Sequence, residues 1–282
     1  MVAHGHSTSN ANTDRRAWIE RRGRLLSSDL APRAFAAATD TGLVRVSNED
    51  TFIADDELGF FAVVDGMGGH ASGRFASTAV AAGLVDFIRQ SAVDPDKTWP
   101  FEPDPALSEP ANRLQVAMRN ANRHLAAARI TEDLPGRSGA TVSAALFADE
   151  RCVVANVGDC RVYLIRDGKA LQLTTDHSLV SEQMRLGLLE PEAARNHPLR
   201  HVVTRAVSGD TDLTVDIWEV GMRPRDRILL CSDGVHGPIH DNELARMASR
   251  PGPDMGVICE EIVAAANRLG GSDNATVVLV EV

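Results

Sequence analysis

Residues 59–70 read Gly-Phe-Phe-Ala-Val-Val-Asp-Gly-Met-Gly-Gly-His, and the rest of the chain is organised around them. Phe60 to Val64 form an unbroken apolar run, which predicts a strand buried on both faces. The run ends at Asp65, glycines follow, and an amphipathic helical pattern begins near residue 71. A carboxylate at a strand end, beside exposed backbone and a helix start, suits a hard metal ion or a phosphate. A tight turn is the equal alternative at this point, because Asp-Gly is a common turn signal.

The composition is that of a folded protein without a membrane span. Its 282 residues, 44% of them apolar, suffice for one large domain or two small ones. No apolar run approaches the roughly 20 residues that cross a bilayer, and the N-terminus lacks the apolar core of a signal peptide. The four cysteines form no CxxC pair, which favours buried free thiols in a reducing compartment. We therefore expect a cytoplasmic protein without membrane insertion.

Charge is spread unevenly along the chain. The net charge of −10 argues against a nucleic-acid-binding protein. Residues 1–33 carry +3 and the remainder −13. We predict that residues 1–33 are a flexible N-terminal extension, with the first 13 disordered. Within it, Arg15 to Leu26 are either a short basic helix or a frayed tail.

From residue 34 onward, apolar patterns predict a mixture of strands and helices. The predicted strands cover residues 34–40, 51–54, 59–64, 140–147, 152–157, 161–165, 170–173, 213–220, 227–231 and 275–282. The predicted helices cover residues 71–90, about 109–128 and 254–269, with short pieces at 178–187 and 191–195. Turn signals separate the middle strands, as in an antiparallel meander. Since these strands are nearly all apolar, we expect an α+β fold of two packed sheets with helices outside.

Three further carboxylates occupy positions like that of Asp65. Asp50 precedes the first strand of the predicted hairpin, Asp233 follows the strand 227–231, and Asp273 leads into the last strand. Four converging carboxylates would repel one another and would need a cation. Oxygen ligands without Cys or His indicate Mg²⁺ or Mn²⁺. Any single Asp-Gly pair can be a plain turn, as we predict for Asp167-Gly168, so the argument depends on the set.

This set resembles the bacterial branch of the PPM family of metal-dependent Ser/Thr protein phosphatases. The matching stretches, in order, are Arg45-Val46-Ser47-Asn48-Glu49-Asp50, Asp65-Gly66-Met67-Gly68-Gly69-His70, Ser138-Gly139-Ala140-Thr141, Val157-Gly158-Asp159-Cys160-Arg161, Thr175-Asp176-His177-Ser178-Leu179-Val180, Val203-Thr204-Arg205-Ala206, Ser232-Asp233-Gly234 and Ser272-Asp273-Asn274. They cover about residues 34–282, which the resemblance makes a single phosphatase domain. It implies a four-layer α-β-β-α sandwich of two antiparallel sheets flanked by helices.

The resemblance also implies the roles of individual residues. Asp65 would bridge two Mn²⁺ or Mg²⁺ ions, and the Gly66 carbonyl would ligate one of them. Asp233 and Asp273 would ligate the other ion, with Asp50 acting directly or through water. A hydroxide shared by the two metals would attack the phosphorus of phosphoserine or phosphothreonine. Arg45, with its guanidinium fork, would bind the phosphate. Asp65 and Asp233 would thus be catalytic together with Arg45.

Some positions depart from the family pattern. The acidic residue that helps hold a third metal is replaced by Gly136, and Asp133 is out of register, so a third metal is doubtful. Met67 stands where eukaryotic members have a His proposed as general acid. The proton donor is therefore open between a metal-bound water, His177 and His197, although both histidines fit structural roles as well. Cys160 replaces a Ser, and we expect a small buried thiol there.

Two irregular segments bear on substrates and partners. Residues 176–209 match the family's flap beside the active site, where we expect substrate choice to be decided. The loop Trp99-Pro100-Phe101-Glu102-Pro103-Asp104 is similar to a feature of phosphatases paired with a Ser/Thr kinase in bacterial type VI secretion clusters. Phosphorylated proteins would be the substrates, and a cognate Ser/Thr kinase the opposing enzyme.

Two other functions remain as alternatives. The first is a catalytically inactive relative that binds phosphoproteins as a regulator. The intact set of Asp50, Asp65, Asp233 and Asp273 argues against it. The second is a structural interaction protein whose Asp residues only cap strands. Metal-dependent hydrolysis of a phosphopeptide, metal binding without turnover, or neither would separate the three hypotheses.

Overall fold

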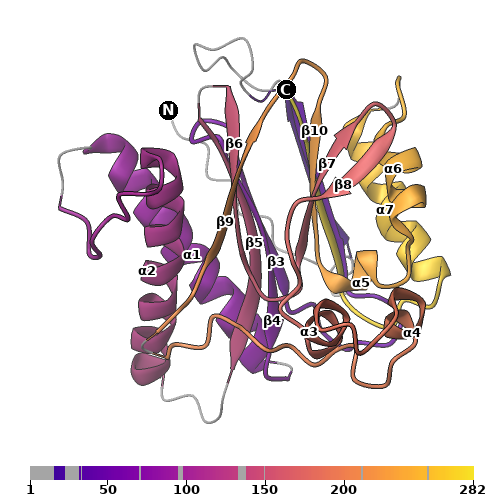
Figure 1. The fold of residues 1–282 in the computed structure, drawn as a ribbon, viewed down its shortest axis with the longest axis horizontal. Coiled ribbons are helices and arrows are strands. Elements are labelled where there is room, and N and C mark those ends of the chain that lie inside the picture. The colour runs from indigo at the N-terminus through magenta and orange to yellow at the C-terminus, as the bar shows by residue number, and fades with distance from the viewer. Residues whose placement is uncertain are drawn as a thin grey trace.

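The structure is a computed structural model, and it describes residues 16–22, 32, 34–69, 71–94, 98–132, 138–148, 150–210, 212–252 and 254–282. Two antiparallel sheets pack face to face, and helices cover both outer faces (Figure 1). This confirms the predicted α+β, four-layer α-β-β-α sandwich. Among the described residues, no helix is long and apolar enough to cross a membrane.

Each sheet is antiparallel throughout the described strands. One has the order β1-β2-β11-β10-β7-β8, and the other the order β3-β4-β5-β6-β9. The strands of the first sheet are β1 (Arg16–Arg22), β2 (Ala34–Asp40), β7 (Arg161–Arg166), β8 (Lys169–Gln172), β10 (Arg227–Cys231) and β11 (Ala275–Glu281). Those of the second are β3 (Asp50–Asp55), β4 (Phe60–Met67), β5 (Gly139–Ala148), β6 (Arg151–Val157) and β9 (Asp216–Gly221).

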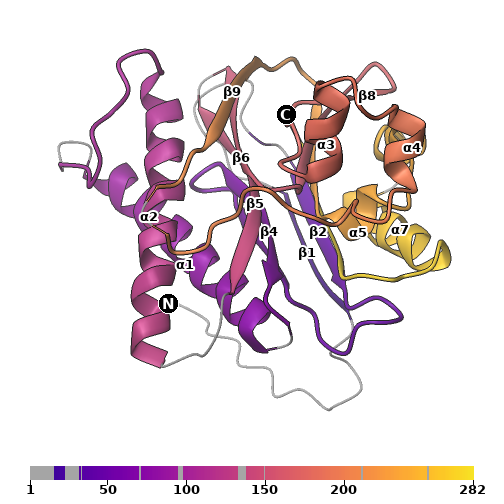
Figure 2. The same cartoon turned by 60° about the horizontal axis from the view of Figure 1, so that its bottom comes forward.

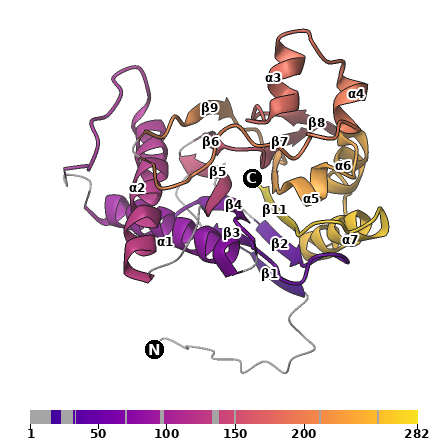
Figure 3. The ribbon, with the colours of Figure 1, turned by 90° about the horizontal axis from the view of Figure 1, so that it is seen from below.

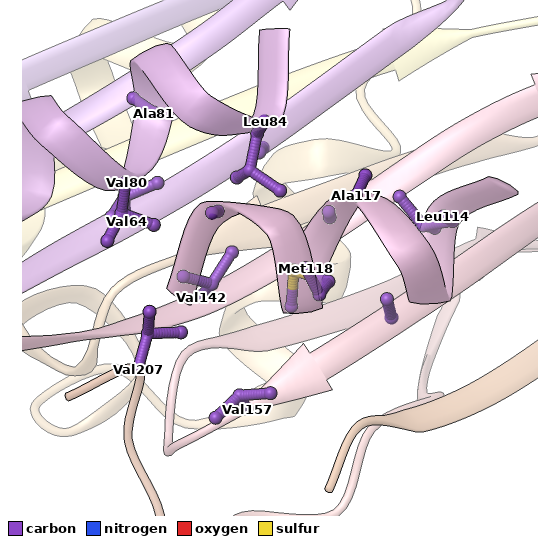
Figure 4. Packing of buried hydrophobic residues seen from close by; sticks show 14 of the residues in the cluster. Val64, Val80, Ala81, Leu84, Leu114, Ala117, Met118, Val142, Val157 and Val207 are labelled. Atoms are coloured by element: carbon purple, nitrogen blue, oxygen red, sulfur yellow. The ribbon is translucent and has the colours of Figure 1, made fainter. Parts of the chain in front are cut away.

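The helices divide between the two outer layers. The long helices α1 (Ala71–Val93) and α2 (Glu109–Glu132) cover the β3–β9 sheet, and their apolar faces meet its side chains (Figure 4). The other sheet is covered by α5 (Asp233–His236), α6 (Asp241–Ala248) and α7 (Met255–Arg268). Two short helices, α3 (Leu179–Arg185) and α4 (Pro191–Arg195), lie at one end of the sandwich (Figure 2).

The strand β4 is buried on both faces, as its apolar run predicts. Phe60, Ala62 and Val64 point towards α1 and α2, because alternate residues of a strand face opposite sides. Phe61 and Val63 point between the two sheets, where the Phe61 ring packs 5.3 Å from that of Phe35. The strand that carries Asp65 is therefore fixed by packing on both of its faces.

The structure corrects the prediction for the N-terminal segment. The short basic helix proposed for Arg15 to Leu26 is wrong, because Arg16–Arg22 form β1 and pair with β2 in register Arg16↔Asp40. Pairing with the open edge of β2 satisfies backbone groups on both segments, a long-range gain that local patterns do not reveal. Residues 1–15, predicted to be disordered in part, lie outside the described residues. The division of the chain at residue 34 stays a prediction.

Candidate active site

The predicted metal ligands meet at one end of the sandwich. A cavity of about 540 Å³ opens there between the loop 41–49, the turn from β4 to α1, the segment before β11 and the predicted flap. In Figure 2 the chain between α4 and β9 crosses this end towards α2. There the backbone N–H groups of Ser208 and Gly209 donate to the side chain of Asn122. The flap segment is thus tied to α2 in the outer layer that covers the β3–β9 sheet.

Asp65 and Asp50 face each other across the β3–β4 hairpin. Asp65 lines the cavity. Asp50 lies behind it, where its Oδ2 accepts hydrogen bonds from Ser232 Oγ at 2.8 Å and Thr276 Oγ1 at 2.6 Å. Because those hydroxyls belong to the other sheet, Asp50 links the two sheets at the site. This position suits an indirect role better than a ligand in the cavity.

Gly66 continues β4 instead of opening the turn, as its partner Ala140 in the ladder shows. A Cβ atom at Gly66 would stand 2.1 Å from the Gly73 carbonyl oxygen and 2.7 Å from that of Glu49. The site therefore requires glycine because α1 and β3 approach the strand so closely. The turn itself uses Gly68 and Gly69, whose φ values are 136° and 81°.

Asp233 is the carboxylate that fits a cation most directly. It begins α5, and its Oδ1 is buried without a hydrogen-bond partner among the described residues. Its Oδ2 lies 3.7 Å from His201 Nδ1. A buried carboxylate oxygen without a donor is costly unless a cation or water meets it. Asp233 is therefore pre-positioned for a ligand in the cavity.

Arg45 and Asp273 form an ion pair at the mouth of the cavity. Arg45 Nη2 donates to Asp273 Oδ2 at 2.7 Å, and about half of the arginine side chain is exposed. Asn274 anchors the same loop, because it accepts from the Glu49 N–H and donates to the carbonyls of Thr41 and Ser47. The loop that carries Arg45 is thereby locked to the end of β11.

The sequence analysis missed several residues of the site. Asp159, which was given no role although it lies in one of the matching stretches, is buried and lines the cavity together with Arg200 and His201. Its Gly158 neighbour has a φ of 111°, and a Cβ there would meet Thr141 at 2.2 Å. The signal that could have found Asp159 is its place within a matched motif, which the comparable Asp167 lacks. No local signal distinguishes Arg200 or His201 from other flap residues.

Crowding of carboxylates changes their protonation. Burial, with the charges of Asp233 and Asp273, raises the pKa of Asp50 to about 7, although hydrogen bonds from Thr276 and Ser232 oppose the shift. Burial and the charge of Asp233 raise the pKa of Asp159 to about 8.

Two other carboxyls of the cavity, those of Asp65 and Asp233, respond in opposite directions. The pKa of Asp65 lies well above its usual range because of burial and of neighbouring carboxylates, Asp50 first among them. Burial would also raise the pKa of Asp233, but His201, His236 and Arg45 outweigh it, so that this pKa is lowered.

These donors fit a hard divalent cation. They are carboxylate oxygens whose charges repel one another, and one of them, Asp233 Oδ1, is buried without a hydrogen-bond partner among the described residues. A bound Mg²⁺ or Mn²⁺ would offset these charges. Among the described residues, no three acidic, His or Cys side chains already form a closed cluster of ligands. The reason is that Asp273 is turned towards Arg45, and Asp50 towards two hydroxyls. The positions 133 and 136, on which the doubt about a third metal rests, lie outside the described residues.

The candidates for the proton donor separate clearly. His177 is buried; its Nδ1 accepts from the Gly158 N–H at 2.9 Å, and its Nε2 lies 3.2 Å from Asp216 Oδ2. Both ring nitrogens are used, which fits the structural interpretation. His197 is not among the residues that line the cavity, whereas Met67 and His201 are. Cys160 is a buried thiol 3.1 Å from Thr141 Oγ1, as expected.

The raised pKa values predict how the metal-free protein responds to pH. In EDTA, the free energy of unfolding should fall as the pH rises from 7.5 to 9, by about 1.4 kcal/mol per pH unit for each proton that the folded protein holds in excess of the unfolded chain. The folded protein holds protons on Asp50 (pKa about 7) and Asp159 (pKa about 8) that the unfolded chain, with Asp pKa values near 3.9, has lost. Urea denaturation measures the slope.

The pH window avoids the histidines. Burial lowers the pKa of His177, and it lowers that of His236 to about 4, so both are uncharged in the folded protein. In the unfolded chain, where the pKa of histidine is about 6.5, they have lost about nine-tenths of their charge above pH 7.5. With saturating Mn²⁺ the slope should flatten, because a bound cation keeps the carboxylates ionised. A metal-free protein that becomes more stable between pH 7.5 and 9 would contradict this account of the site.

The sandwich, with a carboxylate-lined cavity at the end of its sheets, defines a metal-dependent phosphatase fold. A family model described as "Protein phosphatase 2C" matches residues 35–221, and the chain belongs to this family. The predicted membership in the bacterial metal-dependent Ser/Thr protein phosphatases is thereby confirmed.

Individual relatives agree with this assignment. The chain is 37% identical over 250 residues to the serine/threonine protein phosphatase PstP of Mycobacterium tuberculosis, covering 88% of this chain and 45% of that protein. It therefore spans about half the length of that curated relative. It is 34% identical to the serine/threonine phosphatase stp of Listeria monocytogenes, covering 86% of this chain and 93% of that one.

Two solved structures bear on the metals and on the subgroup. A crystal structure of the catalytic domain of PstP in complex with two manganese ions has a TM-score of 0.73 and 34% identity, over 88% of this chain and 96% of that one. A structure of PppA, described as a key regulatory component of T6SS in Pseudomonas aeruginosa, has a TM-score of 0.70 and 28% identity, with the same two shares covered.

Proposed function

We propose that this protein hydrolyses phosphoserine and phosphothreonine in proteins with the help of two Mn²⁺ or Mg²⁺ ions. The observation that carries the proposal is the buried, unpartnered Oδ1 of Asp233, a residue that lines the cavity together with Asp65, Asp159 and Asp273. Asp65, the Gly66 carbonyl, Asp233 and Asp273 would hold the cations. When bound, such ions lower the pKa of coordinated water and offset charge on phosphoryl oxygens. Asp159, missed in the sequence, joins the set as a further candidate ligand.

The protein's own residues would orient the substrate. Arg45 stands at the mouth of the cavity, half exposed, with its guanidinium held by one carboxylate oxygen of Asp273. A phosphate entering the cavity can accept from the rest of the guanidinium fork. Asp50 would act indirectly, by holding Ser232 and Thr276 and so the relative position of the two sheets. The catalytic roles of Asp65 and Asp233 remain those predicted from the sequence.

The partners and the location follow from the same proposal. Phosphorylated proteins would be the substrates, and a Ser/Thr kinase would supply the phosphate that this enzyme removes. The resemblance to PppA is in line with the type VI secretion-associated subgroup, which stays a prediction. All four cysteines are buried and free, which supports a reducing, cytoplasmic environment. The alternative of an inactive phosphoprotein-binding regulator has no observation in its favour.

Metal titration tests the proposal. The purified protein, stripped with EDTA, is given Mn²⁺ or Mg²⁺ and a phosphothreonine peptide, and release of phosphate is measured together with metal binding by calorimetry. Metal-dependent turnover supports the proposal. Metal binding without turnover would favour the inactive regulator, and the absence of both would overturn the assignment of the site.

Arg45→Ala should reduce kcat/KM for the phosphopeptide by about a hundredfold, because it removes a charge-assisted contact to the phosphate. Calorimetry should show Mn²⁺ affinity near that of the wild type, since Arg45 holds no metal. Arg151→Ala is the matched control: this arginine is also exposed and paired with a carboxylate, Glu219, but belongs to β6 away from the cavity. Equal effects of the two substitutions would remove Arg45 from the site.

A further inference from the structure

A second cavity of about 250 Å³ adjoins the candidate active site beneath the flap. Its walls come from α3 and α4 on one side and from α5 and α6 on the other, and Figure 3 shows these elements on the same side of the molecule. It shares Asp159, Arg200, His201 and Asp233 with the active-site cavity. A peptide segment with its phosphorylated residue in the first cavity can therefore extend into the second.

The two carboxylates that only the second cavity contains already have partners. Asp176 accepts from Arg161 Nη2 at 2.7 Å and from Arg161 Nε at 2.8 Å. Asp241 accepts from the Tyr163 hydroxyl at 3.1 Å. Asp241 also lies 3.9 Å from Arg161 Nη1, so this one arginine offsets the charge of Asp176 and part of that of Asp241. The other carboxylates of the lining are the two that it shares with the active site, Asp159 and Asp233.

Two flap arginines at this cavity lack such partners. Arg195 ends α4, and Arg200 lies exposed between α4 and the segment that crosses the sheets. Neither takes part in an ion pair among the described residues, whereas Arg45, Arg161 and Arg205 all do. Two unneutralised guanidinium groups line a cavity that opens onto the site of phosphate chemistry. Such an arrangement attracts anions and disfavours cations.

The remaining wall is apolar. Val180 and Met184 of α3 and Pro191 and Ala194 of α4 line it. An extended peptide can place aliphatic groups against these side chains while an acidic group reaches the guanidinium groups.

We propose that the second cavity binds an anionic group of the substrate, a carboxylate or a further phosphate, on a residue near the phosphorylated one. This inference rests on the proposed phosphatase function and specifies its substrates: phosphoproteins whose phosphorylated residue has an acidic neighbour. Arg195 and Arg200 are the specificity-determining residues. A lysine or arginine at the neighbouring position is disfavoured by the same charges.

A peptide series tests the proposal. Four phosphothreonine peptides differ at a single flanking position, which carries Glu, a second phosphothreonine, Gln or Lys, and the position is varied on both sides of the phosphorylated residue. With Mn²⁺ at low salt, kcat/KM should be about tenfold higher for the Glu or doubly phosphorylated peptide than for the Gln peptide, and lowest for the Lys peptide. The preference should shrink in 0.5 M NaCl. A preference for the second phosphate alone identifies a phosphate subsite, and a preference for both identifies a general anion subsite.

Arg195→Gln should reduce the Glu-to-Gln ratio severalfold, and Arg195→Gln with Arg200→Gln should bring it near one. Arg195 lines only the second cavity, so hydrolysis of p-nitrophenyl phosphate by the single variant should stay at the wild-type rate. Arg185→Gln is the control, because this flap arginine of α3 lines neither cavity. Equal kcat/KM for all four peptides with the wild-type protein overturns the proposal, and so does an Arg185→Gln variant that loses the preference equally.

Peptide binding separates this inference from the proposed function. Fluorescence anisotropy of labelled peptides measures Kd for the wild-type protein and the variants without requiring turnover. A failure to hydrolyse p-nitrophenyl phosphate with either metal counts against the phosphatase function. Tighter binding of the Glu peptide than of the Gln peptide would still support the anion subsite, and equal binding would refute it.

Discussion

Replacing Asp233 with alanine is expected to abolish metal-dependent phosphatase activity, with kcat/KM for a phosphothreonine peptide falling by on the order of a thousandfold or more. Among the residues that the structure describes, Asp233 Oδ1 is the one carboxylate oxygen of the cavity that is buried without a partner, and the pKa of this group is lowered, so that it remains ionised. The substitution removes a charge that the cavity can offer to a cation. Steady-state kinetics over a Mn²⁺ titration measures the loss, and calorimetry should show that one metal site has weakened strongly.

The control for this variant is Asp167→Asn. Asp167 also precedes a glycine at the end of an apolar strand, but it lies in the turn between β7 and β8, with a φ of 52°. Asparagine tolerates that conformation, so activity should stay within about twofold of the wild type. Near-normal activity in Asp233→Ala, or an equal loss in Asp167→Asn, would refute the metal site at this end of the sandwich.

The aspartates at strand ends also show which parts of the fold and the site can be predicted from the sequence. Apolar periodicity located the strands and long helices, because each long element buries one face or both and so repeats with a fixed period. Asp50 and Asp65 could be expected to meet, since a short hairpin leaves few possible registers. Asp159 and Asp167 look alike locally, and only the packing of α5 against the turn after β6 brings one of them to the cavity.

Elements that depend on distant partners were harder to predict. The strand β1 forms because β2 offers an open edge, although its local pattern left only a short basic helix or a frayed tail as alternatives. The helices α5 and α6 are too short, at four and eight residues, to produce a clear period. Arg45 forms an ion pair with Asp273, which lies far away in the sequence. Arg161 of β7 forms one with Asp176, which lies outside that strand. Side-chain pairing of this kind decides which guanidinium groups remain available to a substrate.

Asp65→Asn should have opposite effects on activity and on stability. The substitution removes the carboxylate that would bridge the two metals, so phosphopeptide hydrolysis should fall by about a thousandfold or more. In EDTA at pH 8, however, the variant should be more stable than the wild type by about 1–2 kcal/mol. Burial and neighbouring carboxylates raise the pKa of Asp65, which means that its ionised form destabilises the metal-free fold. Asparagine has nearly the same shape and carries no charge.

Adding Mn²⁺ should reverse the order of stability. The wild type gains free energy of unfolding in proportion to the logarithm of the metal concentration above its Kd, about 2.7 kcal/mol at a hundredfold excess, whereas the variant should gain much less. Urea denaturation of both proteins, with EDTA and with increasing Mn²⁺, measures the two free energies of unfolding and shows whether their order reverses. A variant that is less stable than the wild type in EDTA would show that Asp65 stabilises the fold by contacts of its own. A reversal of the order of stability on adding Mn²⁺ would instead show that Asp65 serves metal binding and lowers the stability of the metal-free protein, as expected of a group selected for catalysis.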